Sequence, residues 1–156
     1  QLPKKQKPKP SWGKPKWEKS KPKSIVVELN SADTAELKEL YGIGSSFAKR
    51  IIKYRELLGG YTHKEQLLEV YGMDTARYNP IVSSLTLDTT IRIKININTA
   101  DFKALIRHPY LNKNQVNAIL NYRKQHGAFT SLTDLSKIHL IKETDVERLL
   151  PYLKTE

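Results

Sequence analysis

The sequence contains no cysteine, and this absence removes several kinds of chemistry at once. Without thiols the chain has no disulfide framework, no thiolate nucleophile and no cysteine-ligated metal. Apolar runs are also short, and none approaches the ~18 consecutive apolar residues that a membrane-spanning helix needs. The chain begins at Gln1 rather than Met, so we expect a processed or excised fragment, with any signal or anchor lying upstream.

Arrangements typical of enzymes are missing as well. The four histidines have no carboxylate or histidine partner at metal-ligand spacing. The sequence has no glycine-rich phosphate cradle, no paired-histidine zinc motif and no nucleophile elbow. We therefore predict that this chain is not an enzyme, that it needs no metal or other cofactor, and that it works by binding.

Positive charge is what the sequence has in excess. It holds 27 Lys and Arg against 16 Asp and Glu, a net charge of +11, which favours a polyanionic partner such as nucleic acid or an anionic membrane surface. The first 24 residues contain nine lysines and one acid, so they carry +8 and leave only +3 for the rest. That remainder is uneven, with −2 over residues 25–88 and +5 over residues 89–156.

Residues 1–24 differ in composition from everything after them. They contain five of the eight prolines and almost no aliphatic residues, which predicts a disordered or extended linker. Both tryptophans of the chain, Trp12 and Trp17, lie here among the lysines. They are either incidental features of a spacer or aromatic side chains that stack on bases or dock on a protein partner.

Beyond Ser24 the chain repeats itself. Residues 29–73 align without a gap on residues 97–141, at a constant shift of 68, and ten positions are identical. Self-similarity of this length indicates two copies of one small domain, which we place at residues 25–88 and 89–156.

Helical signals dominate each copy. In the first, we expect a helix capped by Asn30 and Ser31, a longer amphipathic helix over 46–58, a third helix opened by the capping box Thr62–Glu65, and a fourth element over 76–85. Gly59 and its counterpart Gly127 are expected to end the long helices. The alternating stretches 25–29 and 91–96 are extended lead-ins or a minor β pairing. The predicted fold class is mainly α.

The segment "ELYGIGSSFAKRIIKYR" (39–55) interrupts the helical pattern with two glycines. Gly42 can take a positive φ at the end of the first helix, and Ile43 can then turn inward. Gly44 would leave the next helix's free amides uncovered, so that a phosphate oxygen could approach them. Three cations follow, spaced to lie opposite Phe47 and Ile51: Lys49, Arg50 and Lys53. The alternative is a compact helical corner with a solvated charged face.

These residues resemble the helix-hairpin-helix motif of proteins that bind DNA without sequence specificity. The wider layout over 28–153 is similar to two tandem modules of the ComEA type, found in bacterial competence DNA receptors. The resemblance implies two hairpins per module, whose backbone amides bind duplex phosphates across the minor groove. It assigns to DNA binding the residues Gly42, Ile43, Gly44, Ser45 and Lys49 in hairpin 1 (residues 42–45 and the helix after it) and Gly72 in hairpin 2 (residues 71–74).

The other hairpins depart from that pattern. Hairpin 2 has Asp74 in place of its second glycine, and a carboxylate repels phosphate. Hairpin 3, residues 108–113, has Tyr110 and Asn112 where the first copy has glycines, so we expect the second copy to keep the fold and to lose this mode of binding, apart from help from Lys113 and Asn114. Hairpin 4, residues 139–142, also lacks glycine. Tyr54–Arg55 and Tyr122–Arg123 persist in both copies, and we interpret them as structural, with each arginine bonding hairpin carbonyls.

The sequence thus favours duplex DNA as partner, bound through phosphates without sequence preference by hairpin 1, by Lys49, Arg50 and Lys53, and by the basic tail. The alternative is a scaffold or adaptor that uses the degenerate modules and the tail tryptophans to dock proteins. The resemblance suggests a bacterial protein that is periplasmic or tethered to a membrane by an upstream segment, and a cytoplasmic location is the alternative.

Overall fold

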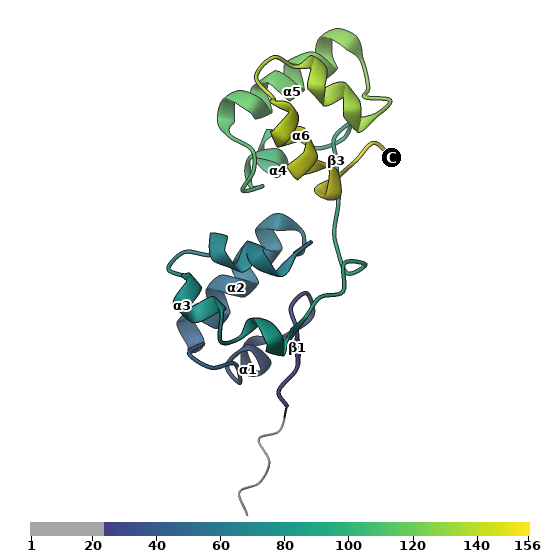
Figure 1. Cartoon of the computed structure of the whole chain (residues 1–156). Helices are drawn as coiled ribbons and strands as arrows, with labels where there is room; N and C mark the ends of the chain where they lie inside the picture. The colour runs from purple at the N-terminus through teal and green to yellow at the C-terminus, as the bar shows by residue number, and fades with distance from the viewer. Residues whose placement is uncertain (1–23) are drawn as a thin grey trace, which may run out of the picture.

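A computed structural model describes residues 24–156 and shows two similar helical modules in tandem (Figure 1). Trp12 and Trp17, for which we predicted stacking or docking, lie outside the described residues. The first module, residues 25–88, contains two short strands, three α-helices and two 3-10 helices. In chain order these are β1 (Val27–Glu28), α1 (Thr34–Leu37), α2 (Ser45–Leu58), η1 (Lys64–Glu69), α3 (Thr75–Tyr78), η2 (Val82–Ser84) and β2 (Leu85–Thr86).

The second module repeats this order. Its elements are β3 (Ile95–Asn96), α4 (Phe102–Ile106), α5 (Lys113–His126), η3 (Leu132–Lys137), α6 (Glu143–Leu149), η4 (Leu150–Tyr152) and β4 (Leu153–Lys154). The long helices α2 and α5 both have 14 residues and begin at positions 68 apart, the same shift as in the sequence. Both end at a glycine with positive φ, Gly59 at 84° and Gly127 at 82°, which confirms that prediction. The mainly α fold is confirmed.

The strands close each module on itself. β1 pairs in parallel with β2, and β3 pairs in parallel with β4, so the first and last segments of each module lie side by side. The minor β pairing expected at 25–29 and 91–96 therefore exists, but each stretch pairs within its own module. The fourth element expected over 76–85 is divided into α3 and η2.

The first helix of each module is capped one turn later than expected. Asp33 caps α1 and accepts a hydrogen bond from the amide of Glu36, and Asp101 caps α4 in the same way. The prediction that Asn30 caps this helix is wrong. Its side chain instead accepts from the amide of Tyr61 at 2.7 Å and donates to the Tyr61 carbonyl at 3.0 Å, which joins the start of the module to the end of α2.

The arginine that is common to both copies also ties this region together. Arg55 donates to the carbonyls of Leu29 and Ala32 at 3.0 and 2.8 Å, and Arg123 bonds the equivalent carbonyls in module 2. The role is structural, as we interpreted it. However, the carbonyls belong to the turn before the first helix and not to the hairpin, because α2 passes that turn at its C-terminal half.

The third helix is a 3-10 helix, and its cap lies one residue beyond the expected box. His63 precedes η1, and Gln66, not Glu65, reaches back to the amides of Thr62 and His63. Gln66 is buried at 1% exposure, so its amide group is drawn into the interior, where it meets residues of the other module.

Each module has its own apolar core. The core of module 1 runs from Val27 to Leu85 in the sequence and that of module 2 from Ile97 to Leu153, and Tyr152 of module 2 packs into the core of module 1. Among the helices of residues 24–156, none combines the length and hydropathy needed to cross a membrane.

Candidate nucleic-acid interface

Hairpin 1 has the backbone form that its glycines suggested. Gly42 has φ +74°, a conformation that side chains disfavour, and Ile43 is 4% exposed and packed into the core of module 1. Gly44 is different, because its φ of −90° and ψ of −179° are extended and open to any residue. A Cβ atom at Gly44 would meet no atom within 4 Å. Neither backbone strain nor packing explains a glycine at this position.

The absence of a side chain at Gly44 leaves the start of α2 open. Gly44 is the N-cap and provides no capping side chain, and the first intrahelical bond runs from the amide of Ala48 to the Gly44 carbonyl at 2.9 Å. Across residues 24–156, no side chain accepts from the amides of Ser45, Ser46 or Phe47. An anion at this helix start would meet free N–H groups and the positive end of the helix dipole.

The equivalent helix of module 2 is capped by a side chain. Asn112 accepts a hydrogen bond from the amide of Gln115 at 2.9 Å, and Gln115 accepts in return from the amide of Asn112 at 3.1 Å. This reciprocal capping occupies the Gln115 amide and places the Asn112 side chain at the helix start that an anion would approach. Lys113, the first residue of α5, is exposed beside them.

The hairpins that follow η1 and η3 are closed by carboxylates. Asp74 caps α3 by accepting from the amide of Arg77 at 2.9 Å, and Asp145 accepts from the amide of Lys142 at 3.2 Å at the start of α6. Among the four hairpins in the described part of the chain, hairpin 1 alone precedes a helix start with neither a capping side chain nor an acid in its first turn.

The three cations after hairpin 1 do not share one environment. Lys49 and Lys53 are exposed on α2, as expected. Arg50 is half-buried, and the prediction that placed it opposite Phe47 is wrong. Its guanidinium lies 5.2 Å from the centre of the Phe47 ring and donates to the Tyr71 carbonyl at 3.2 Å. The hydrogen bond to Tyr71 joins α2 to hairpin 2. The contact with Phe47 is favourable because a guanidinium is attracted to the face of an aromatic ring.

Gly72 in hairpin 2 has a packing reason of its own. A Cβ atom there would lie 3.0 Å from Nη1 of Arg50 and 3.5 Å from the Phe47 ring. Gly72 also has a φ of +81°, which disfavours a side chain, so the backbone conformation and the nearby Arg50 account for this glycine without a ligand. The helix after Gly72 is capped by Asp74, whereas the helix after Gly44 has free amides. The structure therefore does not place Gly72 at a helix start like that of Gly44.

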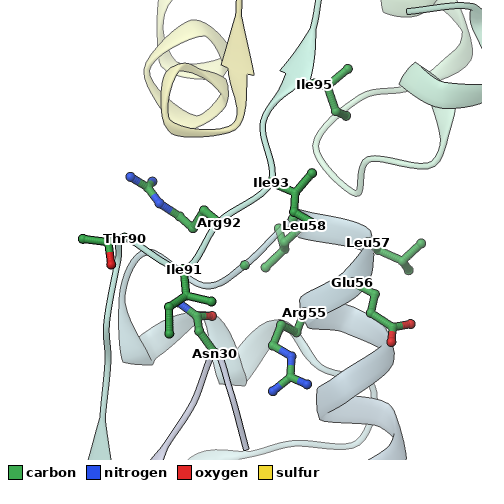
Figure 2. Close-up of a pocket in the computed structure, with 12 residues that line it drawn as sticks. Asn30, Arg55, Glu56, Leu57, Leu58, Thr90, Ile91, Arg92, Ile93 and Ile95 are labelled. Atoms are coloured by element: carbon green, nitrogen blue, oxygen red, sulfur yellow. The ribbon is translucent and has the colours of Figure 1, made fainter.

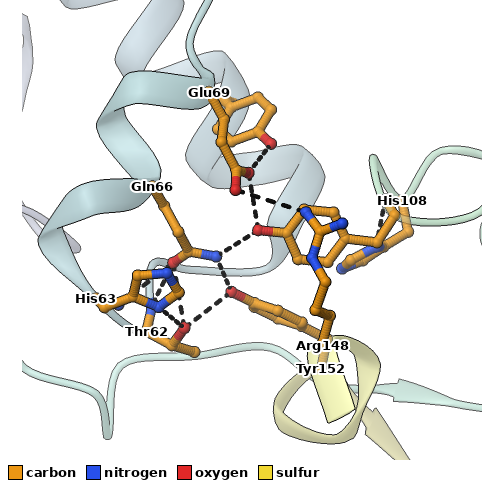
Figure 3. Close-up of polar contacts among 9 residues, drawn as sticks. Thr62, His63, Gln66, Glu69, His108, Arg148 and Tyr152 are labelled. Atoms are coloured by element: carbon orange, nitrogen blue, oxygen red, sulfur yellow. Dashed lines mark hydrogen bonds and ion pairs between the residues drawn. The ribbon is translucent and has the colours of Figure 1, made fainter. Parts of the chain in front are cut away.

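Hairpin 3 contacts the first module through Tyr110, the residue that replaces a glycine. This contact belongs to a polar cluster that includes Gln66, Glu69 and Arg148 (Figure 3). The Tyr110 hydroxyl donates to Glu69 at 2.8 Å and accepts from the side-chain amide of Gln66 at 2.8 Å. Arg148 of α6 lies 4.0 Å over the Tyr110 ring and pairs with Glu69 at 3.6 Å. Sequence reasoning found the lost glycine but not this role, since no local pattern links Tyr110 to residues 41 and 44 positions earlier.

His108 and Tyr152 complete this contact. The His108 ring lies 4.9 Å from that of Tyr152, and its Nδ1 accepts from the amide of Tyr110 at 3.2 Å. Burial lowers the pKa of His108 to about 4, so the imidazole is neutral at physiological pH. His108 of hairpin 3 is thereby used for packing and adds no positive charge.

A separate apolar cavity lies where the chain passes from one module to the next. It has a volume of about 520 Å³ and is bordered by Leu57, Leu58 and the segment 90–93 (Figure 2). Ile93 is 79% exposed at its edge. None of the sequence-predicted binding residues lines it.

A model of the helix-hairpin-helix motif matches residues 22–86 and again residues 91–154. The two matches cover most of the sequence, so the chain belongs to the helix-hairpin-helix family and carries two tandem copies of the motif. No solved structure matches the chain.

Curated relatives include the mouse endonuclease/exonuclease/phosphatase family domain-containing protein 1, which is 28% identical over 154 residues, covering 79% of this chain and 27% of that protein. The zebrafish kinesin-like protein KIF22 is 34% identical over 67 residues, covering 43% of this chain and 11% of that protein. An uncharacterized protein of Haemophilus influenzae is 43% identical over 51 residues, covering 32% of this chain and 46% of that protein. The chain thus spans about a quarter of the length of the first of these relatives.

Proposed function

We propose that the chain binds duplex DNA through its phosphates, without reading sequence, and that hairpin 1 is the primary contact. Binding to DNA is the general activity of helix-hairpin-helix motifs, and the open start of α2 is the observation that carries the proposal here. Gly44 keeps three amides free and accessible, whereas Asn112 closes the same position in module 2. Phosphate oxygens are the ligands that such an amide cluster suits.

Charge next to hairpin 1 supports the same proposal. Lys49 and Lys53 project from α2 into solvent, where they can neutralise neighbouring phosphates. Module 1 as a whole nevertheless carries −2, so a single hairpin with two free lysines should bind weakly. The +8 of residues 1–24 would then supply much of the affinity, while module 2 acts mainly as a structural partner. A ComEA-like organisation is the finer form of this proposal.

We further propose that this chain binds without catalysing a reaction. The name of the mouse relative mentions endonuclease, exonuclease and phosphatase, but the chain spans only 27% of that protein, so the name assigns no activity to these residues. The proposal rests on the sequence, which offers no acid–base pair or nucleophile in an enzymatic arrangement.

Replacement of Gly44 by Glu tests the role of hairpin 1. The carboxylate would stand at the free amides and repel phosphate, so the affinity for a short blunt duplex should fall about tenfold, the equivalent of one charge-assisted contact. Fluorescence anisotropy at several salt concentrations measures this. Asn121→Glu is the matched control, because it places the same charge at an exposed site on α5 and should change binding far less.

A version of the protein that lacks residues 1–23 separates the tail from the hairpin. Its binding should be weaker and should depend less steeply on salt, since fewer phosphates are neutralised. Binding that vanishes without the tail, together with an unchanged affinity in Gly44→Glu, would refute the hairpin proposal.

A scaffold or adaptor role is the second candidate. The apolar cavity beside Ile93 favours it, because Ile93 and Ile91, exposed to 79% and 44%, form contiguous apolar surface with a cavity of about 520 Å³, and such surface is typical of interaction sites. Under this alternative Ile93→Arg would abolish capture of a protein partner, and Gly44→Glu would have no effect on it.

A further inference from the structure

A second concave site lies on module 1, beside the proposed phosphate contact. It is a pocket of about 310 Å³ between α2 and the segment that leads into hairpin 2. Its lining consists of Arg50, Lys53, Tyr54, Leu57, Val70 and Tyr71. Apart from Lys53 and Arg50, none of these residues was assigned to DNA binding by the sequence.

The Tyr71 ring forms an exposed aromatic wall of this pocket. Tyr71 is 82% exposed, whereas an aromatic ring that serves in packing buries most of its surface. The guanidinium of Arg50 lies 5.1 Å from the centre of the ring and is held from the other side by Phe47. Arg77 in turn covers Phe47 at 4.6 Å. The Tyr71 ring is thus held against Arg50 and is still open to solvent.

Charge and apolar surface complete the site. Leu57 and Val70 contribute apolar surface, and the Tyr54 hydroxyl is already bonded to Glu69 at 2.6 Å. Lys53 is exposed, and Arg50 has five N–H donors, of which one is used on the Tyr71 carbonyl. A planar aromatic ring with a negative charge beside it matches this combination: the ring stacks on the exposed Tyr71, and the charge meets Lys53.

We propose that this pocket holds the base of an unpaired nucleotide next to a duplex that is bound at hairpin 1. Arg50 lies one turn along α2 from the open amides of Ser45–Phe47, so one nucleic-acid strand can reach both places. The nucleotide's base would stack on Tyr71, and its phosphate would lie near Lys53. The duplex part of the inference rests on the proposed function, whereas the pocket itself requires only single-stranded nucleic acid.

Two fluorescent probes test the inference in the full chain. One is a blunt duplex, and the other is the same duplex with a three-nucleotide single-stranded extension. The wild-type protein should bind the extended probe about tenfold more tightly, as expected for stacking of one base. Tyr71→Ala should lose this preference, whereas Tyr71→Phe, which keeps the ring, should retain it.

Tyr41→Ala is the matched control. Tyr41 precedes Gly42 as Tyr71 precedes Gly72 and is 79% exposed, but it does not line the pocket. It should leave the ratio between the two probes unchanged. Circular dichroism of each variant verifies that it is folded.

The inference is overturned if the wild type binds both probes equally, or if Tyr71→Ala weakens both by the same factor. A pocket that serves an aromatic side chain of a protein partner would give these results. Gly44→Glu keeps the two proposals distinguishable. If it fails to weaken binding of the blunt duplex, the hairpin proposal falls, while a Tyr71-dependent gain on the extended probe or on a single strand alone still supports the pocket.

Discussion

At the scale of single residues, the two modules differ most instructively at Gly44 and Asn112. Both occupy the N-cap of a 14-residue helix, and both have extended backbone angles. Asn112 satisfies the amide of Gln115, whereas Gly44 offers no acceptor to Phe47. An Asn at an N-cap is worth a few tenths of a kcal/mol over Gly. The first module therefore forgoes some stability to keep its helix start free.

This difference makes a prediction in which stability and binding change in opposite directions. Gly44→Asn should give α2 the cap that α5 has, because a Cβ atom meets nothing within 4 Å and φ is already extended. The free energy of unfolding should rise by a few tenths of a kcal/mol, read from urea denaturation. Affinity for the blunt duplex should fall several-fold, because the side chain competes with phosphate for the same amides.

Gly44→Ala is the control for that experiment. It adds a methyl group but no hydrogen-bond acceptor, so it should weaken DNA binding less than Asn does. If Asn leaves the affinity for DNA unchanged, the open amides of α2 are not a phosphate site.

At the scale of elements, hairpin 3 shows that the turn between helices does not depend on glycine. No residue other than glycine has a positive φ in residues 24–156, so Tyr110 makes the turn with ordinary backbone angles where Gly42 uses +74°. The side chain gained at this position is then directed at Glu69 and Gln66 of module 1. Hairpin 3, which lacks the glycines of hairpin 1, thus serves as a contact between the modules.

His108 makes this contact dependent on pH. Burial lowers the pKa of its imidazole to about 4, against about 6.5 when unfolded. Between these pH values the unfolded chain binds the proton and the folded chain does not. The contribution of His108 to the free energy of unfolding is therefore full above pH 6.5 and is lost as the pH falls toward 4. The free energy of unfolding should drop by about 2 kcal/mol between pH 7.5 and pH 5.

Urea denaturation at these two pH values, with His108→Asn alongside, isolates this effect. The Asn side chain can accept from the Tyr110 amide as Nδ1 does, but it cannot be protonated, so its stability should change less with pH. A second group, Glu28, titrates in a different range. Partial burial raises the pKa of Glu28, but hydrogen bonds from Asp88, Ser31 and Asn30 lower it, and the net pKa lies below its ordinary value. Glu28 therefore loses its contribution to the free energy of unfolding only at lower pH. An equal slope in wild type and His108→Asn would show that His108 is not the titrating group.

At the scale of the whole molecule, the polar contacts of Figure 3 join two modules that each have a core. Tyr152 of module 2 reaches Thr62 at 3.2 Å, and Arg148 pairs with Glu69 at 3.6 Å. Tyr152 also packs into the core of module 1, which adds apolar contact to these bonds. Residues 25–156 should therefore behave as one body in solution.

Tyr110→Ala should uncouple the modules without unfolding them. The variant removes the ring beneath Arg148 and leaves Glu69 and Gln66 each without one partner, while the fully buried residues of both cores are unchanged. NMR relaxation should then give each module a shorter rotational correlation time than in the wild type. Tyr41→Ala, which changes an exposed tyrosine that takes no part in these polar and aromatic contacts, should leave the correlation time unaltered. Unchanged relaxation in Tyr110→Ala would mean that other contacts hold the modules together.

Much of the fold could be predicted from local pattern. The repeat, the long helices ending at Gly59 and Gly127, the positive φ of Gly42 and the inward Ile43 all follow from signals within a few residues of each other. The open helix start also follows, because Gly44 has no side chain with which to cap it.

Only the tertiary structure decided the partners of residues far apart in the sequence. Asn30 resembles a local cap, but it is used to bind Tyr61, 31 positions away. Arg50 has the spacing of a solvated cation, but the approach of hairpin 2 places it between Phe47 and Tyr71. The identity of Asn30 and Asn98 in the two copies was the one hint of such a role. A sequence pattern reports the geometry of one helix or turn, whereas these contacts depend on how separate elements pack.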